Sequence, residues 1–291
     1  MSAPRVVVVG GANMDVGGMP AAALRLRDSN PGEVRLRPGG VGRNIAHDLR
    51  LLGLDVALVT ALGDDLFGAA LRQSCEARGL DLSMTLTVPG ARTSSYLYVT
   101  DGGEMHVGVA DMDVIARLGP DVLAPLLPKL DAADAVVLDA NLSAGAIDFL
   151  AENCRAPLYA DPVSAAKAPR LRRALPRLAA INPNAIEAAA LTGEADPERA
   201  LRALLDAGVK RVFVSLGADG LLAAEGKTIL RLPCLPCRVV DTTGAGDAAM
   251  AAVVWAGLRG LGLAETGRAA LSAGAQTAAC AETNPPSLRL V

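Results

Sequence analysis

The 291-residue sequence predicts an α/β fold, in which a doubly wound, mostly parallel sheet carries helices on both faces and a small antiparallel β lid is added to it. From residue 134 onward, short apolar segments with strand character alternate with Ala-rich helical segments, as in a parallel sheet. Other segments alternate polar and apolar residues, as strands with one exposed face do: 33–37, 93–99 and 104–109. We therefore expect one domain over residues 1–291, with a lid at roughly residues 12–37 and 91–110.

The composition narrows the class of protein. Apolar residues make up 51% of the chain but aromatic residues only 2%, so alanine, valine and leucine must pack the core. The net charge of −3, without any lysine/arginine block, argues against nucleic acid as a partner. The apolar runs are shorter than the ~18 residues of a membrane span, and residues 1–9 resemble a strand more than a signal peptide. We expect a soluble, cytoplasmic protein that binds neither membranes nor nucleic acids and keeps its cysteines reduced.

Two polar candidates follow the first predicted strand. Residues 5–9 form a continuous apolar run suited to a strand buried on both faces, and Asn13 and Asp15 come shortly after it. Because ligands of open α/β sheets bind at the carboxyl ends of the strands, both side chains are placed to meet one. Ordinary turn chemistry is an alternative explanation for both residues.

A pair of glycines, Gly39 and Gly40, precedes a helix whose apolar positions follow a 3.6-residue period from Val41 to Leu52. Asn44 lies one turn after Gly40, at the edge of the predicted buried stripe. Glycines at a helix start expose backbone N–H groups to a ligand, and an asparagine amide both donates to and accepts from hydroxyl groups. The sequence therefore predicts either a helix start that binds hydroxyl groups or one that is simply close-packed.

The remaining segments continue the alternation of strands and helices. Further strands are expected at residues 56–61, 135–138, 158–160, 179–181 and 211–215. Further helices are expected at residues 66–78, 144–153 and 185–191, and a hairpin is expected at residues 221–232. In a parallel sheet, the loops that follow such strands share the edge at which ligands bind.

Asn184 and Glu187 lie three positions apart at the start of a predicted helix, so their side chains share one face of it. An asparagine N-cap with a glutamate at the third helical position is a capping box, which explains the pair without any ligand. An amide and a carboxylate at the carboxyl end of a strand also suit the water shell of Mg²⁺, an ion that keeps several waters and binds phosphates. The two roles are compatible.

The segment from Asp241 to Asp247 ends a short β-branched run and leads into an Ala-rich helix. Gly244, Ala245 and Gly246 lie where the unpaired N–H groups and the positive dipole end of that helix meet, so their backbone can form a nest for a phosphate. Asp247, in the same turn, can deprotonate a hydroxyl that attacks the bound anion. A Gly-rich turn with an acidic first-turn residue is the plain structural alternative.

Residues 244–249 also fit the dinucleotide fingerprint G-x-G-x-x-G/A, which would indicate an oxidoreductase. That fingerprint opens a βαβ unit with an acidic residue at the end of the next strand, about 20 residues further on. Here the next segment, residues 261–279, has another helical pattern instead of a strand. The sequence therefore disfavours the oxidoreductase.

Three motifs occur in the order and rough spacing of one known family: Gly39-Gly40 with Asn44, Asn184 with Glu187, and residues 241–247. On these motifs, the chain resembles the ribokinase-like (PfkB) carbohydrate and nucleoside kinases over nearly its whole length. The resemblance implies a ribokinase-like fold and an ATP-dependent phosphotransferase that requires Mg²⁺. Many relatives also bind a monovalent cation such as K⁺.

The resemblance further implies catalytic and metal-binding roles. Asp247 would be the base for the substrate hydroxyl, while the nest at residues 244–246 would stabilise the phosphoryl group during transfer. Asn184 and Glu187 would organise Mg²⁺ through its waters. Asp241 and Thr243 match the positions of the monovalent cation site.

Binding roles are implied in the same way. The positions that would bind the nucleotide are Asn184, Ser215, Gly217, Gly220 and Thr242. The positions that would hold the sugar hydroxyls are Asn13, Asp15, Gly39, Gly40, Asn44 and Asn141.

Within the family, the sequence resembles the pseudouridine kinases at residues 10–15, 28–32, 39–46, 111–112 and 139–143. Val41 and Asn141 stand where the ribokinase pattern has a lysine and an acidic residue. The implied reaction is phosphorylation of the 5′-hydroxyl of pseudouridine by ATP, with Ser29, Asn30 and Asp111 meeting the polar edge of the base.

Two alternatives to this substrate assignment are kept open. One is another nucleoside or sugar kinase, of the ribose, adenosine or fructose type. The other is a nucleoside-binding regulator that keeps the fold but has no catalytic activity. In either case, an exposed edge of the lid sheet predicts a homodimer.

Overall fold

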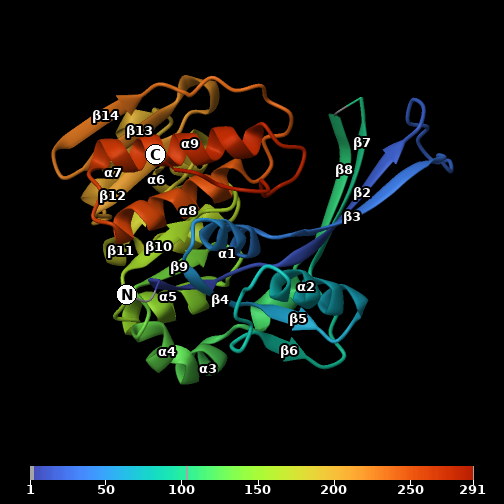
Figure 1. Cartoon of the computed structure of the whole chain (residues 1–291), viewed down its shortest axis with the longest axis horizontal. Coiled ribbons are helices and arrows are strands. Elements are labelled where there is room, and N and C mark those ends of the chain that lie inside the picture. The colour runs from blue at the N-terminus through green and yellow to red at the C-terminus, as the bar shows by residue number, and fades with distance from the viewer. Residues whose placement is uncertain (1–2, 103, 291) are drawn as a thin grey trace.

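The computed structural model describes residues 3–102 and 104–290, and its main body is built on an eight-stranded sheet (Figure 1). The strand order is β14-β13-β12-β11-β10-β9-β1-β4. Neighbours from β12 to β4 are parallel, whereas β13 and β14 form an antiparallel edge on β12. The bounds are β1 (Arg5–Val9), β4 (Asp55–Val59), β9 (Ala135–Asp139), β10 (Leu158–Asp161), β11 (Leu178–Ile181), β12 (Arg211–Ser215), β13 (Leu221–Glu225) and β14 (Thr228–Leu232).

Helices cover both faces of this sheet, because successive side chains of each strand enter opposite apolar layers. In β1, Val7 and Val9 pack in the layer of α5, α6 and α7, while Val6 and Val8 pack in the layer of α1, α8 and α9. These helices span α1 (Val41–Leu51), α5 (Ala144–Asn153), α6 (Ala185–Thr192), α7 (Pro197–Asp206), α8 (Ala245–Leu258) and α9 (Leu263–Ala278). The predicted fold class, a doubly wound and mostly parallel sheet, is confirmed.

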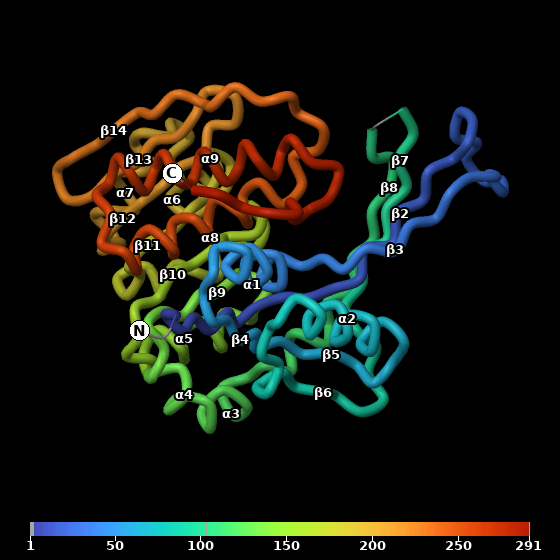
Figure 2. Tube along the Cα trace, in the orientation of Figure 1, coloured from blue at the N-terminus to red at the C-terminus, as the bar shows by residue number. Residues whose placement is uncertain are grey.

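A second sheet of four strands projects from the main body as a β lid (Figure 1). Its order is β3-β2-β7-β8, from β2 (Asn13–Pro20), β3 (Gly32–Gly39), β7 (Ser95–Asp101) and β8 (Glu104–Asp111). Its hairpins are antiparallel, but the central pair of β2 and β7 is parallel. Figure 2 shows the connection between β2 and β3 at the outermost tip of this sheet. Gly103, between β7 and β8 in the sequence, lies outside the described residues.

Several elements differ from the sequence-based expectation. Residues 13–20 form a lid strand whose glycines, Gly17 and Gly18, interrupt the alternating pattern that would predict it. The β-branched residues Val239 and Val240 are exposed and belong to no strand, because the N–H of Val240 bonds to Ala278 at the end of α9. Elements that the sequence analysis does not predict are α7, the short helices between residues 113 and 131, and a two-stranded sheet of β5 (Ala61–Gly63) and β6 (Leu86–Val88).

The parallel strands end side by side and so gather their following loops. Asp139 and Asp161 are register partners at the carboxyl ends of β9 and β10. β1 runs on into the lid through Asn13, while α2 (Leu66–Glu76) packs beneath the base of the lid. Within residues 3–102 and 104–290, none of the helices combines the length and apolarity that crossing a membrane requires.

Candidate active site

Helices α1 and α8 bring together two residues that the sequence singles out. Asp247 lies in the first turn of α8 and is 8% exposed, and Asn44 lies in the first turn of α1 and is 5% exposed. The Nδ2 of Asn44 donates a 2.8 Å hydrogen bond to Oδ2 of Asp247. The bond fixes the orientation of the carboxylate and leaves its Oδ1 for another partner.

The surroundings of Asp247 strongly perturb its acidity. Burial raises the pKa of Asp247 from its ordinary value of 3.8 to about 7. The hydrogen bond from Asn44 and the charge of Arg43 oppose this rise in pKa, while Asp139 and Glu187 add to it. A carboxylate with a pKa near neutrality is a stronger base than an exposed aspartate and is still ionised in much of the enzyme above pH 7. Asp247 is therefore suited to accept a proton from a hydroxyl.

The turn before α8 has the shape of an anion nest. Gly244 is in the left-handed region at a φ of 82°, and a Cβ there would lie 2.1 Å from the carbonyl oxygen of Thr283. Nothing lies within 4 Å of the Cβ position of Gly246, so a ligand can approach its backbone. The N–H of Ala245 donates to the carbonyl of Thr242, and the next N–H groups of the first turn point away from any helical acceptor. The geometry suits a phosphate beside Asp247.

A buried carboxylate that the sequence analysis missed holds the neighbouring loops in place. Asp139 is fully buried and accepts hydrogen bonds from the backbone N–H groups of Gly11 (2.8 Å), Gly42 (2.7 Å) and Asn141 (2.9 Å). A Cβ on Gly42 would meet this carboxylate at 3.0 Å and the backbone of Gly10 at 2.9 Å. The sequence offered one signal for Asp139, namely its position as the last residue of an apolar strand. In the structure, Asp139 fixes the start of α1.

Four of the predicted sugar-binding residues meet at the base of the lid. Asn13 and Gly39 are register partners in β2 and β3, and the Nδ2 of Asn13 donates to Oδ1 of Asp15 at 2.6 Å. A Cβ on Gly39 would lie 2.2 Å from the Asp15 carboxylate, and Gly40, at a φ of 98°, packs on the backbone of Ala12. Burial raises the pKa of Asp15 to about 6. The result is a polar pair, with Asn13 buried and Asp15 half-buried, against glycine backbone.

Asn141 lies against the same group of residues. It is 8% exposed, and a Cβ on Gly11 would lie 2.7 Å from its Nδ2. The Oδ1 of Asn141 accepts a 2.7 Å hydrogen bond from the Nζ of Lys167, a half-buried ammonium whose pKa burial lowers. Sequence reasoning missed Lys167, because a single lysine in the loop after β10 carries no recognisable pattern. It places a cation beside the amide of Asn141.

The structure does not bring together the three residues that the sequence assigned to the nucleobase of the substrate. Asp111 ends β8 at the base of the lid, where its carboxylate accepts from Nε of Arg92 at 3.2 Å. Ser29 and Asn30 lie in the loop at the opposite end of the β2–β3 hairpin, beyond the pair of Pro20 and Gly32 (Figure 2). The amide of Asn30 is engaged there with the backbone of Arg25. Within one chain, Ser29 and Asn30 are therefore distant from Asn13 and Gly39, and we do not assign them to the site.

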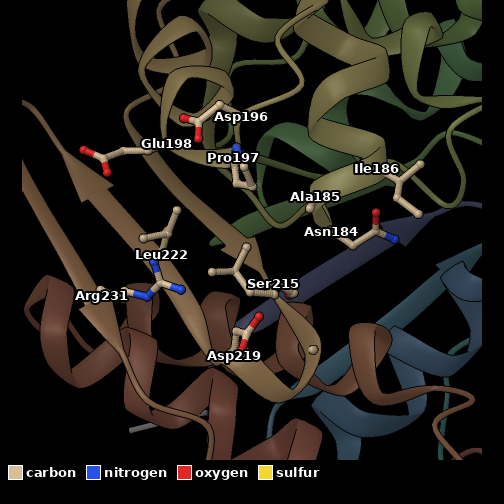
Figure 3. Close-up of a pocket in the computed structure, with 12 residues that line it drawn as sticks. Asn184, Ala185, Ile186, Asp196, Pro197, Glu198, Ser215, Asp219, Leu222 and Arg231 are labelled. Carbon is tan, nitrogen blue, oxygen red and sulfur yellow. The ribbon is translucent and has the colours of Figure 1, made fainter.

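A cleft of about 460 Å³ lies between the starts of α6 and α7 and the strands at the β12–β14 edge (Figure 3). Asn184, Ser215 and Gly217 line it, as the sequence-based nucleotide assignment requires. Gly220, at a φ of 91°, closes the turn, since a Cβ would lie 2.0 Å from the carbonyl oxygen of Leu232. Thr242 lies outside the cleft, beside the anion nest.

The charge of the cleft indicates which part of a nucleotide it suits. Asp196, Glu198 and Asp219 line it with a single guanidinium, that of Arg231. Three carboxylates repel a triphosphate, whereas they can accept hydrogen bonds from hydroxyl and amino groups. The cleft therefore suits the nucleoside part of a nucleotide, and the nest before α8 suits its phosphates.

The predicted capping box at α6 is present. The N–H of Glu187 donates to Oδ1 of Asn184, and the N–H of Asn184 donates to Oε2 of Glu187, both at 2.9 Å. Glu187 is also one of three buried carboxylates, with Asp161 and Asp247. Burial raises the pKa of each, and the charge of Glu187 raises the pKa of Asp161 and of Asp247 further. A divalent cation would relieve this repulsion, so these side chains fit Mg²⁺ held largely through water.

Asp241 and Thr243 lie in the loop that precedes the nest. Oδ1 of Asp241 accepts a 2.9 Å hydrogen bond from the N–H of Thr243, and the N–H of Asp241 bonds to Ala278. The loop thereby packs against the segment after α9, whose Thr283 carbonyl faces Gly244. Backbone carbonyls and one carboxylate in two adjoining loops are ligands that alkali cations accept.

In this arrangement, a substrate hydroxyl and a phosphoryl donor can come together between the lid and the start of α8. An anion nest with a buried carboxylate base, next to a sheet that can serve as a lid, is the arrangement expected of phosphotransferases that move a phosphoryl group to an alcohol. The chain belongs to the pfkB family of carbohydrate kinases, whose family model matches residues 3–289. It is accordingly a kinase, and the family uses ATP.

Similar proteins include kinases that are named for different substrates. The pseudouridine kinase of Escherichia coli strain K12 is 35% identical over 98% of this chain and 94% of its own length. A pseudouridine kinase of Arabidopsis thaliana is 28% identical over 76% of this chain and 65% of its own length. The ribokinase of Lactococcus lactis is 29% identical over 84% of this chain and 80% of its own length.

Solved structures agree on the fold. A carbohydrate kinase from Agrobacterium tumefaciens superposes with a TM-score of 0.86 at 31% identity, covering 97% of this chain and 92% of that one. Arabidopsis thaliana ribokinase, solved with ribose and ATP, superposes with a TM-score of 0.84 at 22% identity, covering 98% and 96%. The ribokinase-like fold expected from the sequence is confirmed.

Proposed function

We propose that this kinase transfers the γ-phosphoryl group of ATP to the 5′-hydroxyl of pseudouridine and forms pseudouridine 5′-phosphate. The observation that carries the reaction type is the Asn44–Asp247 hydrogen bond, which sets an oriented base beside the anion nest. The substrate rests on similarity to two pseudouridine kinases, one of them 35% identical over 98% of the chain. We place the protein in the cytoplasm in this proposal, because ATP and free nucleosides are both present there.

In this proposal, Asp247 accepts the proton of the 5′-hydroxyl while that oxygen forms its bond to the γ-phosphorus. The bond between the γ-phosphorus and the ADP oxygen breaks, and ADP leaves with the bonding electrons. Phosphoryl transfer has a loose transition state, so positioning and charge stabilisation matter more than a strong base. The N–H groups of the nest that have no acceptor in the first turn of α8, such as that of Gly246, supply that stabilisation at the transferring group.

The remaining residues hold the two substrates. Asn13, Asp15, Gly39, Gly40 and Asn141 surround the sugar side, with Asp111 at the base of the lid, and Ser215, Gly217, Gly220 and Thr242 serve the nucleotide side. Asn184 and Glu187 would hold Mg²⁺ through water, and the bound ion would neutralise charge on the phosphates. Asp241 and Thr243 with the loop after α9 would hold K⁺. The lid excludes water, which would otherwise compete as the acceptor.

A substrate panel tests the proposed function. The purified protein is incubated with Mg·ATP and, separately, pseudouridine, uridine, adenosine, ribose or fructose, and ADP and the phosphorylated product are measured. We expect the highest kcat/KM for pseudouridine. Preference for another acceptor would reassign the substrate within the family. Tight nucleoside binding without turnover of any acceptor would instead support a regulator that has lost catalysis.

We also propose that the protein is a homodimer whose interface is one face of the lid. Register places Leu36 of β3, Leu97 of β7 and Val109 of β8 in one row across the sheet, through Val16 of β2. Leu36, Leu97 and Val109 are 58%, 46% and 60% exposed. The adjacent row adds the exposed Val34 and Val107 to what we call the apolar lid face. Asp15 points to the opposite face by strand alternation, so the apolar lid face is free to meet a second copy.

A further inference from the structure

A second cavity lies outside the site described above. It measures about 240 Å³ and is formed where the base of β3, the start of α1, the end of α2 and the segment after α9 come together. Arg37, Arg43, Arg78 and Glu282 line it, and it shares no lining residue with the cleft of Figure 3. Its volume accommodates a tetrahedral oxyanion with a small substituent.

The cavity is positively charged, because three guanidinium groups face a single lining carboxylate. Among residues 3–102 and 104–290, no carboxylate lies within 4.0 Å of a guanidinium nitrogen of Arg37, Arg43 or Arg78. Arg37 donates to the carbonyl of Ala281 and Arg78 donates to Ser74, both neutral acceptors. Among the described residues these three cationic donors therefore form no ion pair, although Asp15 lies close enough to Arg37 and Arg43 for their charges to lower its pKa.

Arg43 is the buried member of this group. It is 3% exposed, and its Nη1 donates to Pro38, Asn44 and Asn284, while its buried Nε has no partner among the described residues. Burial and repulsion from the charge of Arg78 lower the pKa of Arg43, whereas Cys75 and Asp48 raise it. An anion between them would relieve that repulsion.

The carboxylate nearest in sequence balances this charge only in part. Asp48, one helical turn after Asn44, is fully buried and accepts from Nδ2 of Asn284. Burial raises the pKa of Asp48 well above its ordinary value, so its neutral form is favoured. His47 also faces this region, and burial with the charges of Arg43 and Arg78 lowers its pKa to about 4, so it is neutral at pH 7.

We infer that this cavity binds a small phosphate-type oxyanion, held by Arg37, Arg43 and Arg78 as a site separate from the phosphate nest at α8. The cavity is connected to the catalytic pair, since Arg43, which lines it, donates from Nη1 to Oδ1 of Asn44 at 2.8 Å, and Asn44 donates to Asp247. A bound anion would stabilise the folded state, because it binds the native cavity and not the unfolded chain.

Direct binding of inorganic phosphate tests the inference. Phosphate is titrated calorimetrically at constant ionic strength, with the nest occupied by a saturating, non-hydrolysable Mg·ATP analogue. The variants Arg78→Gln and Arg37→Gln remove cavity cations, and Arg268→Gln, at an exposed position on α9, is the matched control. We expect roughly tenfold weaker phosphate binding in each cavity variant and wild-type binding in the control.

A second titration with ribose 5-phosphate identifies the source of the anion. Binding of the ester that is also weakened by Arg78→Gln assigns the site to phosphate monoesters, and binding of inorganic phosphate alone assigns it to the free ion. Absence of phosphate binding beside the bound nucleotide analogue, or equal binding in wild type and both cavity variants, overturns the inference. These measurements need no turnover, so their failure leaves the proposed kinase reaction standing, and failure of the substrate panel leaves this site standing.

Discussion

At the residue scale, the chemistry depends on the carboxylate of Asp247, which the fold buries although burial disfavours its charged form. Asp247 is buried and has a pKa of about 7, so near neutral pH it is divided between its charged and neutral forms. Only the charged form can accept the proton of the substrate. Asn44 favours that form by donating to it, and the same packing of α1 on α8 that brings them together also removes water.

The first prediction concerns the pH dependence of the rate. The value of kcat/KM should rise as pH increases through about 7 and level off above it, because Asp247 must be ionised. In Asn44→Ala the donor is lost, so this rise should move to higher pH by roughly one unit. Initial rates between pH 5 and 9 check both statements. An unchanged profile in the variant would separate Asn44 from the ionisation of Asp247.

The second prediction concerns stability. Since the pKa of Asp247 is raised in the folded state from 3.8 to about 7, its contribution to stability is complete below pH 4 and is lost as pH rises through 7. Asp247→Asn removes the buried charge, so the variant should gain stability relative to wild type at pH 8, by at most about 4 kcal/mol, and should gain less than half of that at pH 5, where only part of the loss between the two pKa values has accumulated. Urea unfolding without ligands at the two pH values measures this. The exposed Asp206→Asn is the control, and a variant that is less stable than wild type at pH 8 contradicts the argument.

At the element scale, the start of α8 separates a glycine needed for folding from one needed for binding. Gly244→Ala should destabilise the protein by about 1–2 kcal/mol or more, because φ is 82° and the carbonyl of Thr283 is 2.1 Å from the new Cβ. Gly246→Ala should keep its thermal midpoint but lose most of kcat, since its Cβ enters only the space of the ligand. Thermal unfolding and steady-state rates on both variants check this. Equal losses of stability would show that the opening at Gly246 is not a ligand approach.

Elements whose signals are local could be predicted from the sequence. The Gly40 start of α1 and the capping box of α6 are read from residues within four positions of each other. β2 could not be predicted, because it is stabilised by pairing with β3 and β7 and not by its own composition. The role of Asp139 could not be predicted for a similar reason. Its hydrogen-bond donors, the N–H groups of Gly11 and Gly42, are about 100 or more residues away in the sequence.

The same distinction applies within the candidate site. The order of the motifs along the chain indicated that Asn44, Glu187 and Asp247 belong to one site. In the structure, Asn44 donates a hydrogen bond to Asp247, and the charge of Glu187 raises the pKa of Asp247. Ser29 and Asn30 were assigned by their place near the lid, yet sequence cannot tell which end of a hairpin a loop occupies. Lys167 and the arginine cavity have no motif at all, since their partners come from separate elements.

At the scale of the whole molecule, the lid is a sheet with two different faces. One face meets the sugar side of the site through Asp15, and the other presents the apolar lid face to solvent. Leu36→Asp should therefore convert the dimer into a monomer, while Leu66→Asp, at an 87% exposed leucine on α2, should leave the dimer intact. Sedimentation equilibrium of the three proteins decides this. A monomeric wild type, or a dimeric Leu36→Asp variant, contradicts the proposed interface.

The central claim is that Asp247 is the base of a phosphoryl transfer to a nucleoside hydroxyl. The direct measurement is the turnover of Mg·ATP and pseudouridine by wild type and Asp247→Asn, with nucleoside affinity determined in parallel by calorimetry. We expect kcat to fall by roughly 10²–10⁴-fold in the variant, while the dissociation constant of pseudouridine stays within a few-fold of wild type. A variant that turns over at the wild-type rate would contradict the claim.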